Sequence, residues 1–390
     1  MDITIHPRLL RGTIEAPPSK SLAHRYLICA ALSDNPTQLI CKEISRDIGA
    51  TIGCLQALGA KISPTDTGFS IFPISALPKT AQLPCGESGA TLRFLLPIAG
   101  ALGIDATFIL EGRLPERPLS PLWEEMERMG CSLSRPTDHT IHCTGKLHPG
   151  HYRIDGSISS QFITGLLFAL SLLPGSDLEI IGKTESTPYI AMTRSAMDLF
   201  QMPHYHSPGR ITVEGDWSSA AFWEAAAYLS SDAISIENLN ESSMQGDRAI
   251  SDLLPLLCNA APTISAADIP DLIPVLSIVA AANHGARFTD IRRLRLKESD
   301  RVAAIMDMIH SLGGNAEASD NCLTIYGTGL QGGTVDSRND HRIAMSAAIA
   351  AIVCKQPVTI LGAECVQKSY PIFWEDYQLL GGKYDQFLRK

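Results

Sequence analysis

The feature that most limits how this chain can fold is a junction that recurs along it. At each junction an amphipathic helix is predicted to end in Gly, which readily adopts the left-handed conformation that stops a helix, and a short strand follows. Four junctions have this form, at 56–62, 127–133, 310–316 and 378–384. Two weaker ones, without the Gly, lie at 198–203 and 255–260. The repeated junction predicts an α/β protein.

Short strand patterns accompany these junctions, at 70–72, 140–143, 210–213 and 322–325. The repeat is too long and too irregular for a solenoid. A chain of 390 residues is also longer than one hydrophobic core normally accommodates. We therefore expect two globular domains with three α/β units in each. The alternative is that helix–Gly–strand junctions recur by chance, as they can in any α/β protein.

The composition excludes several classes of protein. With 45% hydrophobic and 19% charged residues, the chain is typical of ordinary globular proteins. A net charge of −9 argues against a general nucleic-acid-binding protein but permits small anionic substrates held by local cations. The first seven residues lack a signal-peptide pattern, and the apolar run at 273–283 is too short to span a membrane. We expect a cytoplasmic protein with no membrane or nucleic-acid partner.

The ten cysteines show no paired spacing and no Cys-x-x-Cys motif, which predicts reduced thiols in the core. A group of histidines raises the alternative of a metal site: His139, His142, His148 and His151. No set of Cys or carboxylate residues completes a plausible coordination geometry with them. We therefore predict a polar loop and strand edge in this region, and no metal.

Three clusters of charged residues indicate the chemistry. Residues 295–301 contain three cations and two carboxylates, 339–342 place His and Arg behind an Asn-Asp pair, and 18–25 combine Lys, His and Arg with two serines. Arg binds phosphate and carboxylate, Lys supplies a point charge, and Glu, Asp and His exchange protons. On a helix, Lys297 and Arg301 would share one face and would repel each other without an anion. The clusters predict a site that holds two anions and moves protons.

Helix starts add to this prediction. Ser19, Ser88, Ser159 and Asn339 each precede or open a segment with a helical apolar pattern. Helix N-termini carry unpaired N–H groups and a partial positive charge, which favour anions. Several such starts facing one cleft would attract anions even without Arg.

These motifs together resemble the 5-enolpyruvylshikimate-3-phosphate (EPSP) synthase family of enolpyruvyl transferases. The resemblance covers nearly the whole chain. No single motif decides it, but seven occur in the expected order: Lys20-Ser21 with Arg25, the Gly-rich segment 86–93, Arg117-Pro118-Leu119, Ser159-Ser160-Gln161, Lys297-Glu298-Ser299-Asp300-Arg301, Asn339-Asp340-His341-Arg342 and Lys368-Ser369-Tyr370-Pro371.

The resemblance implies a reaction and a fold. Members transfer the enolpyruvyl group of phosphoenolpyruvate to the 5-hydroxyl of shikimate 3-phosphate and release phosphate, with no metal or organic cofactor. Their fold implies an α/β chain of two similar domains, each of three βαβαββ units in an inverse-barrel arrangement. One domain would comprise residues 1–17 and 214–390, and the other residues 18–213, with the active site in the cleft between them. A monomer is common in such families.

The resemblance also implies a role for each matching residue. Shikimate 3-phosphate would be held by Lys20, Ser21, Arg25, Ser159, Ser160, Gln161, Ser186, Asp271 and Lys297. Phosphoenolpyruvate would be held by Lys20, Gly89, Arg117, Gln161, Arg301, Arg342 and Lys368. The catalytic groups would be Asp271 as the base for the attacking hydroxyl, Glu298 as the acid that protonates the methylene carbon, Lys20 sharing the proton transfer, and His341 orienting Glu298.

Several of these residues have structural alternatives when taken alone. Arg25 and Arg93 would each often be a structural cation, and Asp271 a turn residue or helix cap. Asp300 is predicted to pair with a nearby Arg, and Asp216 to cap a helix.

Two positions depart from the family pattern. Glu87 stands where many members have Asn, so a carboxylate would lie near a bound phosphate unless Arg93 or Arg117 neutralised it. Arg293 stands where a substrate-contacting Asn is often found.

Two other functions are weighed against this one. The related transferase that acts on UDP-N-acetylglucosamine usually carries a reactive Cys in a mobile loop, whereas residues 111–117 here contain none. In a binding protein that had lost the reaction, Lys20, Asp271, Glu298 or the Arg residues would be replaced by other residues. All of them are present in this chain.

Overall fold

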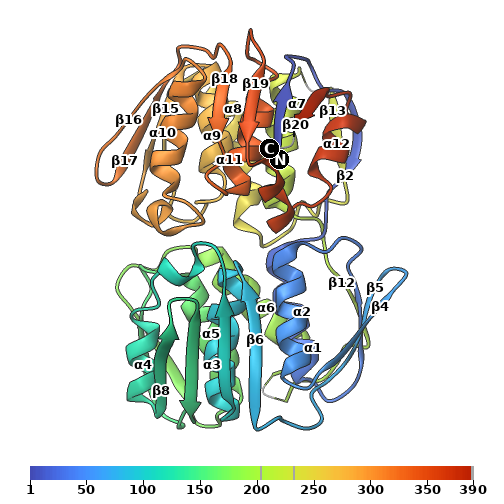
Figure 1. Ribbon diagram of the computed structural model, residues 1–390, viewed down its shortest axis with the longest axis vertical. Helices are drawn as coiled ribbons and strands as arrows, with labels where there is room; N and C mark the ends of the chain where they lie inside the picture. Colours follow the sequence, from blue (N-terminus) through green and yellow to red (C-terminus); the bar gives the residue numbers. More distant parts are fainter. Residues whose placement is uncertain (203, 232, 388–390) are drawn as a thin grey trace. The chain divides into compact units, whose positions relative to one another are not determined.

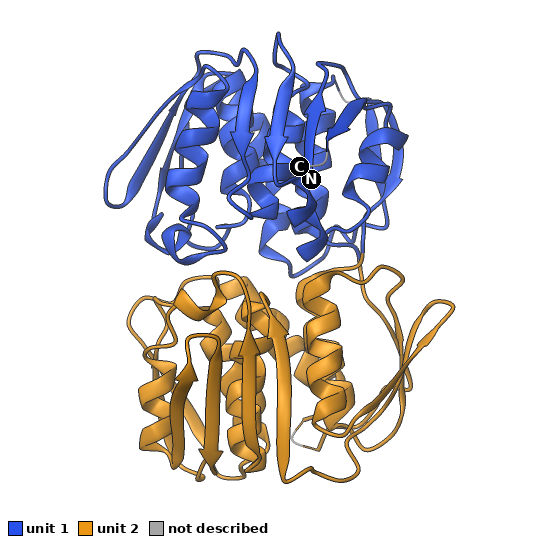
Figure 2. Ribbon diagram, in the orientation of Figure 1, with its two compact units in different colours: residues 1–17, 215–390 blue, residues 18–214 orange. Residues whose placement is uncertain are grey.

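The computed structural model describes residues 1–202, 204–231 and 233–387. The chain forms two compact units, shown in Figure 2: unit 1 comprises Met1–Pro17 and Gly215–Lys390, and unit 2 comprises Pro18–Glu214. The chain passes between them twice. The ends of unit 2 are joined where Ser19 N donates to Glu214 O at 2.8 Å.

Unit 2 contains three sheets among its described residues. In hydrogen-bonding order, their strands are β12 (Arg210–Thr212), β3 (Thr37–Ile40), β5 (Gly68–Phe72) and β4 (Lys61–Thr65); β6 (Thr80–Gly86), β7 (Asp105–Leu110), β9 (Thr140–Gly145) and β8 (Cys131–Thr137); and β10 (His151–Asp155) with β11 (Asp177–Ile181). The strands expected near 70–72, 140–143 and 210–213 are thereby confirmed.

The described part of unit 1 repeats this plan. Its strands are β18 (Gly333–Asp336), β19 (Val358–Leu361), β1 (Asp2–Ile5) and β20 (Tyr384–Phe387); β14 (Thr263–Ser265), β15 (Gly285–Thr289), β17 (Cys322–Tyr326) and β16 (Asn315–Ala318); and β13 (Ile234–Glu237) with β2 (Gly12–Glu15). In every four-stranded sheet the first pair is parallel and the next two pairs are antiparallel. In each two-stranded sheet the two strands are parallel.

The six predicted helix ends belong to every second helix of the chain: α2 (Arg46–Ala57), α4 (Leu122–Arg128), α6 (Thr187–Leu199), α8 (Ile250–Asn259), α10 (Arg301–Ser311) and α12 (Phe373–Leu379). Gly59, Gly130, Gly313 and Gly381 follow four of them with φ between 79° and 111°, and Gln201 follows α6 with φ 52°. The prediction that Gly stops these helices through a left-handed turn is confirmed for the four glycines, and Gln201 does the same where no such residue was predicted.

The other six helices are more deeply buried: α1 (Lys20–Leu32), α3 (Gly89–Leu102), α5 (Ser160–Ser171), α7 (Trp217–Leu229), α9 (Ile273–Ala282) and α11 (His341–Ala350). In unit 1, α9 packs against α11, whose residues are all buried, and in unit 2 α3 packs against α5 (Figure 1). Gly165 permits the second contact, because a Cβ there would collide with Arg93 O. Four of these inner helices start at a predicted site residue.

None of the helices in the described part of the chain has the length and apolar character that crossing a membrane requires.

Each unit has its own hydrophobic core, and the two ends of unit 2 are hydrogen-bonded to each other. We therefore expect residues 18–214, produced alone, to fold and to unfold cooperatively in urea. Circular dichroism and a urea titration measure this. A gradual loss of signal without a cooperative transition would contradict the expectation.

Candidate active site

Arg301 is the centre of the charged cluster in unit 1. Its side chain is 1% exposed, yet it contacts three carboxylates. Nε donates to Asp340 Oδ2 at 2.9 Å, and the terminal nitrogens donate to Asp271 Oδ1 at 2.6 Å and Glu298 Oε2 at 2.5 Å. Burial would lower the pKa of Arg301, but the carboxylates hold it well above its ordinary value. The guanidinium is therefore a permanent cation that joins three segments of the chain.

Asp340 is fully buried and has two roles. It accepts hydrogen bonds from Arg301 and from Ser299 Oγ, the latter at 2.9 Å. Its Oδ1 also accepts from Arg342 N at 3.0 Å and so caps α11. Asn339 precedes the cap in a left-handed conformation, with φ 57°. One carboxylate thus fixes both Arg301 and the start of α11.

The prediction that Lys297 and Arg301 share one face of a helix is wrong. The 3₁₀ helix η3 (Arg292–Leu296) ends before Lys297, and α10 begins only at Arg301. Asp300 caps α10. Its short side chain can accept hydrogen bonds from the free N–H groups at a helix start, so Asp is favoured at this position and disfavoured inside a helix. Both cations nevertheless face Asp271, and Lys297 Nζ lies 3.6 Å from its Oδ1.

Three cations converge on Asp271. Besides Arg301 and Lys297, Arg342 donates to its Oδ2 at 3.1 Å. Burial alone would raise the pKa of Asp271, but Arg342, Lys297 and Arg301 hold it well below its ordinary value. The pKa of Lys297 falls to about 8, chiefly because the ammonium is buried. Asp271 is thus an ionised counter-ion in this structure, and α9 begins after it without using it as a cap.

The start of α11 positions further predicted residues. His341 and Arg342 are its first two residues, and both are buried. Lys368 ends the 3₁₀ helix η4 (Ala363–Lys368), and its Nζ donates to Asn339 O at 2.7 Å. Unit 1 therefore brings six predicted residues to one connected cluster: Asp271, Lys297, Glu298, Arg301, Arg342 and Lys368.

In unit 2, predicted residues lie at the starts of inner helices. Lys20 opens α1, and its Nζ forms an ion pair with Asp47 Oδ2 on α2 at 2.9 Å. Ser159 caps α5 by accepting from Gln161 N at 3.3 Å, and Ser160 is the first residue of that helix. These helix starts offer backbone N–H groups suited to an anion.

Gly89 opens α3 between two guanidinium groups. A Cβ at this position would lie 2.5 Å from a terminal nitrogen of Arg93 and 2.8 Å from one of Arg117. Arg93 also donates to Gln161 Oε1 at 3.0 Å and to Pro118 O at 3.2 Å. Arg93 therefore bonds one predicted residue, Gln161, and lies beside another, Gly89, which the sequence did not indicate, and a side chain at position 89 would displace both cations.

Arg25 is buried and bonded within its own unit. It donates to Thr193 Oγ1 at 2.9 Å, to Ser21 O at 2.6 Å and to Tyr189 O at 2.9 Å, and burial lowers its pKa to about 10. These contacts support the structural alternative for Arg25, and its role in binding stays a prediction. Ser186 precedes α6 with φ 56°, a strained conformation for a residue other than Gly.

The structure shows what lies near Glu87 and Arg293, the two residues that depart from the family pattern. The carboxylate of Glu87 lies against Gly112, where a Cβ would collide with it, in the turn that leads to Arg117. Its neutralisation by an Arg stays a prediction. Arg293 lies close enough to Lys297 to help lower the pKa of that lysine, after the larger effect of burial.

The sequence analysis missed Asp247, in the 3₁₀ helix η2 (Gly246–Ala249). It is 1% exposed and accepts from Ser218 Oγ, and its Oδ1 has no hydrogen-bond partner among the described residues. Burial, together with repulsion from Asp271, raises its pKa to about 7 against the attraction of Arg342. No sequence signal separates this residue from an acid in a surface turn.

The histidine-rich region has no metal-binding arrangement. His142 Nε2 lies 2.6 Å from Asp105, and His151 Nδ1 lies 2.7 Å from Asp177, all on strands. Across residues 1–202, 204–231 and 233–387, no three His, Cys, Asp or Glu side chains are grouped to hold a metal ion.

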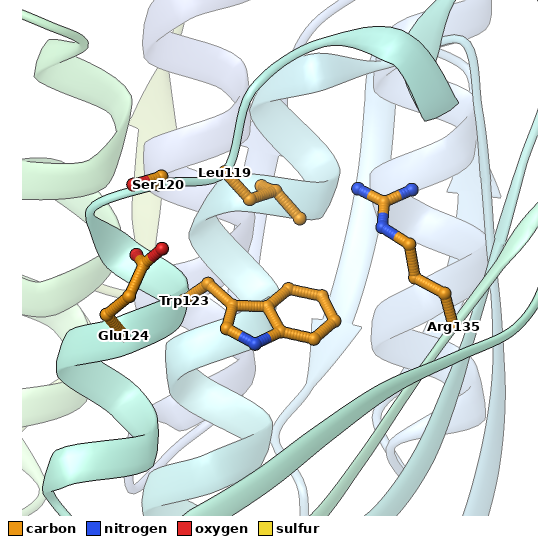
Figure 3. Close-up of a pocket in the computed structure, with 5 residues that line it drawn as sticks. All are labelled: Leu119, Ser120, Trp123, Glu124 and Arg135. Atoms are coloured by element: carbon orange, nitrogen blue, oxygen red, sulfur yellow. The ribbon is translucent and has the colours of Figure 1, made fainter.

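A pocket also occurs in unit 2. Figure 3 shows its lining, which contains no predicted site residue: Leu119, Ser120, Trp123, Glu124 and Arg135. The guanidinium of Arg135 lies 5.8 Å from the centre of a Trp123 ring.

Comparison with known proteins identifies the family. The family model described as EPSP synthase (3-phosphoshikimate 1-carboxyvinyltransferase) matches residues 5–257 and 258–377. The chain belongs to the EPSP synthase family. It is 38% identical to the 3-phosphoshikimate 1-carboxyvinyltransferase of Clostridium kluyveri, over 99% of this chain and 98% of that protein. The enzyme of the same name from Clostridioides difficile is 37% identical, over 99% and 98% of the two chains.

Solved structures agree on the fold. The EPSP synthase from Acinetobacter baumannii is similar with a TM-score of 0.78 at 22% identity, covering 99% of this chain and 100% of that one. The enolpyruvyl transferase NikO from Streptomyces tendae has a TM-score of 0.73 at 18% identity, covering 98% of each chain. The expected fold class, an α/β enolpyruvyl transferase architecture, is confirmed.

Replacing Asp247 by Asn should change how stability depends on pH. Because the pKa of Asp247 rises from about 3.9 in the unfolded chain to about 7 in the folded one, the folded state binds the extra proton and stability falls as pH rises through this range. Asn mimics the protonated form and removes that loss. The melting temperature of Asp247→Asn relative to wild type should therefore increase from pH 5 to pH 8.

The control is Asp252→Asn, at an exposed position of α8. Its melting temperature relative to wild type should not vary with pH. A difference for Asp247→Asn that stays constant from pH 5 to 8 would show that Asp247 is already ionised at the lower pH.

Proposed function

We propose that this chain transfers the enolpyruvyl group of phosphoenolpyruvate to the 5-hydroxyl of shikimate 3-phosphate and releases phosphate, a step in chorismate and aromatic amino-acid biosynthesis. The family and the names of the full-length relatives support this reaction. The observation that carries the proposal is the convergence of Arg301, Arg342 and Lys297 on Asp271, with Glu298 beside them. Such a group of cations beside a carboxyl acid suits an anionic substrate that must be protonated.

Shikimate 3-phosphate would be held mainly by unit 2. Its phosphate would be bound by Ser159, Ser160 and Ser186, all at helix starts, together with Lys297 of unit 1. The remaining contacts of this substrate would come from Lys20, Ser21, Arg25, Gln161 and Asp271. Burial lowers the pKa of Lys297 to about 8 in this structure, and a bound phosphate would favour its charged ammonium.

Phosphoenolpyruvate would be held by Arg117, Arg301, Arg342 and Lys368, with Lys20 and Gln161 beside it. Gly89 supports this assignment, because the missing side chain lets the guanidinium groups of Arg93 and Arg117 lie against the start of α3. Two or more Arg side chains can bind a carboxylate and a phosphate by paired hydrogen bonds.

The reaction would proceed by addition and elimination. Glu298, oriented by its bond to Arg301, would protonate the methylene carbon, with Lys20 sharing the proton transfer and His341 orienting Glu298. The 5-hydroxyl would then add to the cation-like carbon, lose its proton to Asp271 and form a tetrahedral intermediate. Loss of phosphate together with a proton from the new methyl group would regenerate the double bond. Water would compete for that carbon, so the site must exclude it.

Asp271 would change its role when substrates bind. With its pKa held well below the ordinary range by three cations, it is a poor base in this structure. Anions that bind Arg342 and Lys297 would compete for these cations and raise the pKa of Asp271. Substrate binding would thus convert Asp271 from a counter-ion into the group that accepts the proton of the 5-hydroxyl.

The proposal includes a monomer that acts in the cytoplasm without a cofactor. The ten cysteines are free thiols, which fits a reducing compartment.

The test is phosphate release by the purified protein with both substrates, beside Glu298→Gln. Gln keeps a hydrogen-bond acceptor for Arg301 but cannot donate the proton, so the rate should fall by roughly 100-fold or more. UDP-N-acetylglucosamine, offered as the acceptor in place of shikimate 3-phosphate, should release no phosphate.

The control is Glu375→Gln, an exposed glutamate on α12, which should keep the wild-type rate. Phosphate release with UDP-N-acetylglucosamine would show that the protein has the activity of the related transferase instead. Absence of release with either acceptor would contradict the proposed function, and an unchanged rate in Glu298→Gln would remove Glu298 as the acid.

A further inference from the structure

The turn between β18 and α11 contains two consecutive strained residues. Arg338 has φ 51° and Asn339 has φ 57°, although neither is Gly. Left-handed backbone at residues other than Gly is unfavourable and persists where the surroundings enforce it. The turn leads directly into Asp340, which caps α11 and binds Arg301. Whatever enforces this turn therefore also positions the start of α11.

Ser337 makes most of the contacts that enforce the turn. Its side chain is 1% exposed. Its Oγ accepts a hydrogen bond from Asn339 N at 3.3 Å, and its carbonyl accepts one from Asp340 N at 2.9 Å. One further bond closes the turn, from Arg338 N to Asp336 Oδ1 at 2.8 Å. The backbone N–H groups of all three residues after Ser337 are thus bonded within the turn.

The same hydroxyl reaches the segment that carries Lys368. Ser337 Oγ donates to Gly362 O at 3.1 Å, and Ser337 N donates to Leu361 O at 3.1 Å. Gly362 immediately precedes η4 with φ 72°, and a Cβ there would lie 2.8 Å from Ser337 Oγ. At the other end of η4, Lys368 Nζ donates to Asn339 O. The turn and η4 are therefore joined at both ends.

We propose that Ser337 is a positioning residue that sets the placement of Arg342 and Lys368 for the same anion. The inference rests on the proposed function, in which both cations bind phosphoenolpyruvate. The Ser337 side chain makes no substrate contact in this account. It acts through the strained turn, on one side through Asp340 to Arg342, and on the other through η4 and Asn339 O to Lys368.

The test is Ser337→Ala, which removes the hydroxyl and keeps the backbone bonds. The KM for phosphoenolpyruvate should rise by roughly tenfold, because two of its ligands lose their fixed spacing. The KM for shikimate 3-phosphate should change much less, since most of its proposed ligands belong to unit 2. A general loss of stability would not raise the KM for phosphoenolpyruvate while leaving the KM for shikimate 3-phosphate nearly unchanged.

The matched control is Ser346→Ala, inside α11. Ser346 is fully buried, and its hydroxyl has no hydrogen-bond partner in the described part of the chain. Both KM values should stay at the wild-type level. In the double variant Ser337→Ala, Asn339→Gly, the KM for phosphoenolpyruvate should recover in part, because Gly adopts a positive φ without strain.

Hydrogen exchange separates this inference from the proposed function. Amides at 338–340 should exchange faster in Ser337→Ala than in wild type, with α9 unaffected. Faster exchange with an unchanged KM for phosphoenolpyruvate would overturn the positioning role, and unchanged exchange would overturn the role of the hydroxyl in holding the turn. If wild type releases no phosphate while exchange still increases, the proposed function fails and the anchoring of the turn stands.

Discussion

The structure of unit 1 depends on one buried cation. Arg301 is 1% exposed, and an unpaired guanidinium at that depth would be strongly unfavourable. Asp271, Glu298 and Asp340 neutralise it from three segments that are distant in sequence or separated by a helix break. If these segments moved apart, the buried guanidinium would lose its counter-ions. The cluster thus fixes the positions of residues that would otherwise lie on independent loops.

The six inner helices alternate along the chain with the outer helices α2, α4, α6, α8, α10 and α12, and in each unit several of the proposed ligands lie at the start of an inner helix. Outer helices such as α10 end in left-handed glycines and turn the chain back into a strand. Inner helices such as α3 and α11 are mostly apolar, and their charged side chains lie within the first two turns. Side chains and free N–H groups therefore collect at the starts of the inner helices, where anions are favoured. Gly89 and Arg342 illustrate the result, one in each unit.

The sequence alone predicted the features that depend on one or a few neighbouring residues. Gly59 and Gly313 ended helices as expected, because only the backbone conformation of one residue is involved. The family motifs indicated which residues to examine, but not their contacts. The 297–301 segment was misjudged as a helix because the preference of Asp300 for a cap outweighs helical spacing. Asp247 was missed entirely, since its raised pKa arises from burial and from repulsion by Asp271, which no local pattern records.

The free energies of unfolding of Asp340→Asn and Asp300→Asn, compared by urea titration, test the central role of the Arg301 cluster most directly. Both aspartates cap helices, but only Asp340 is bonded to Arg301. The account predicts a loss of about 3–5 kcal/mol for Asp340→Asn, because Arg301 loses a buried partner. Asp300→Asn should lose less than about 1 kcal/mol, since Asn is also a good cap. Equal, small losses would contradict the account.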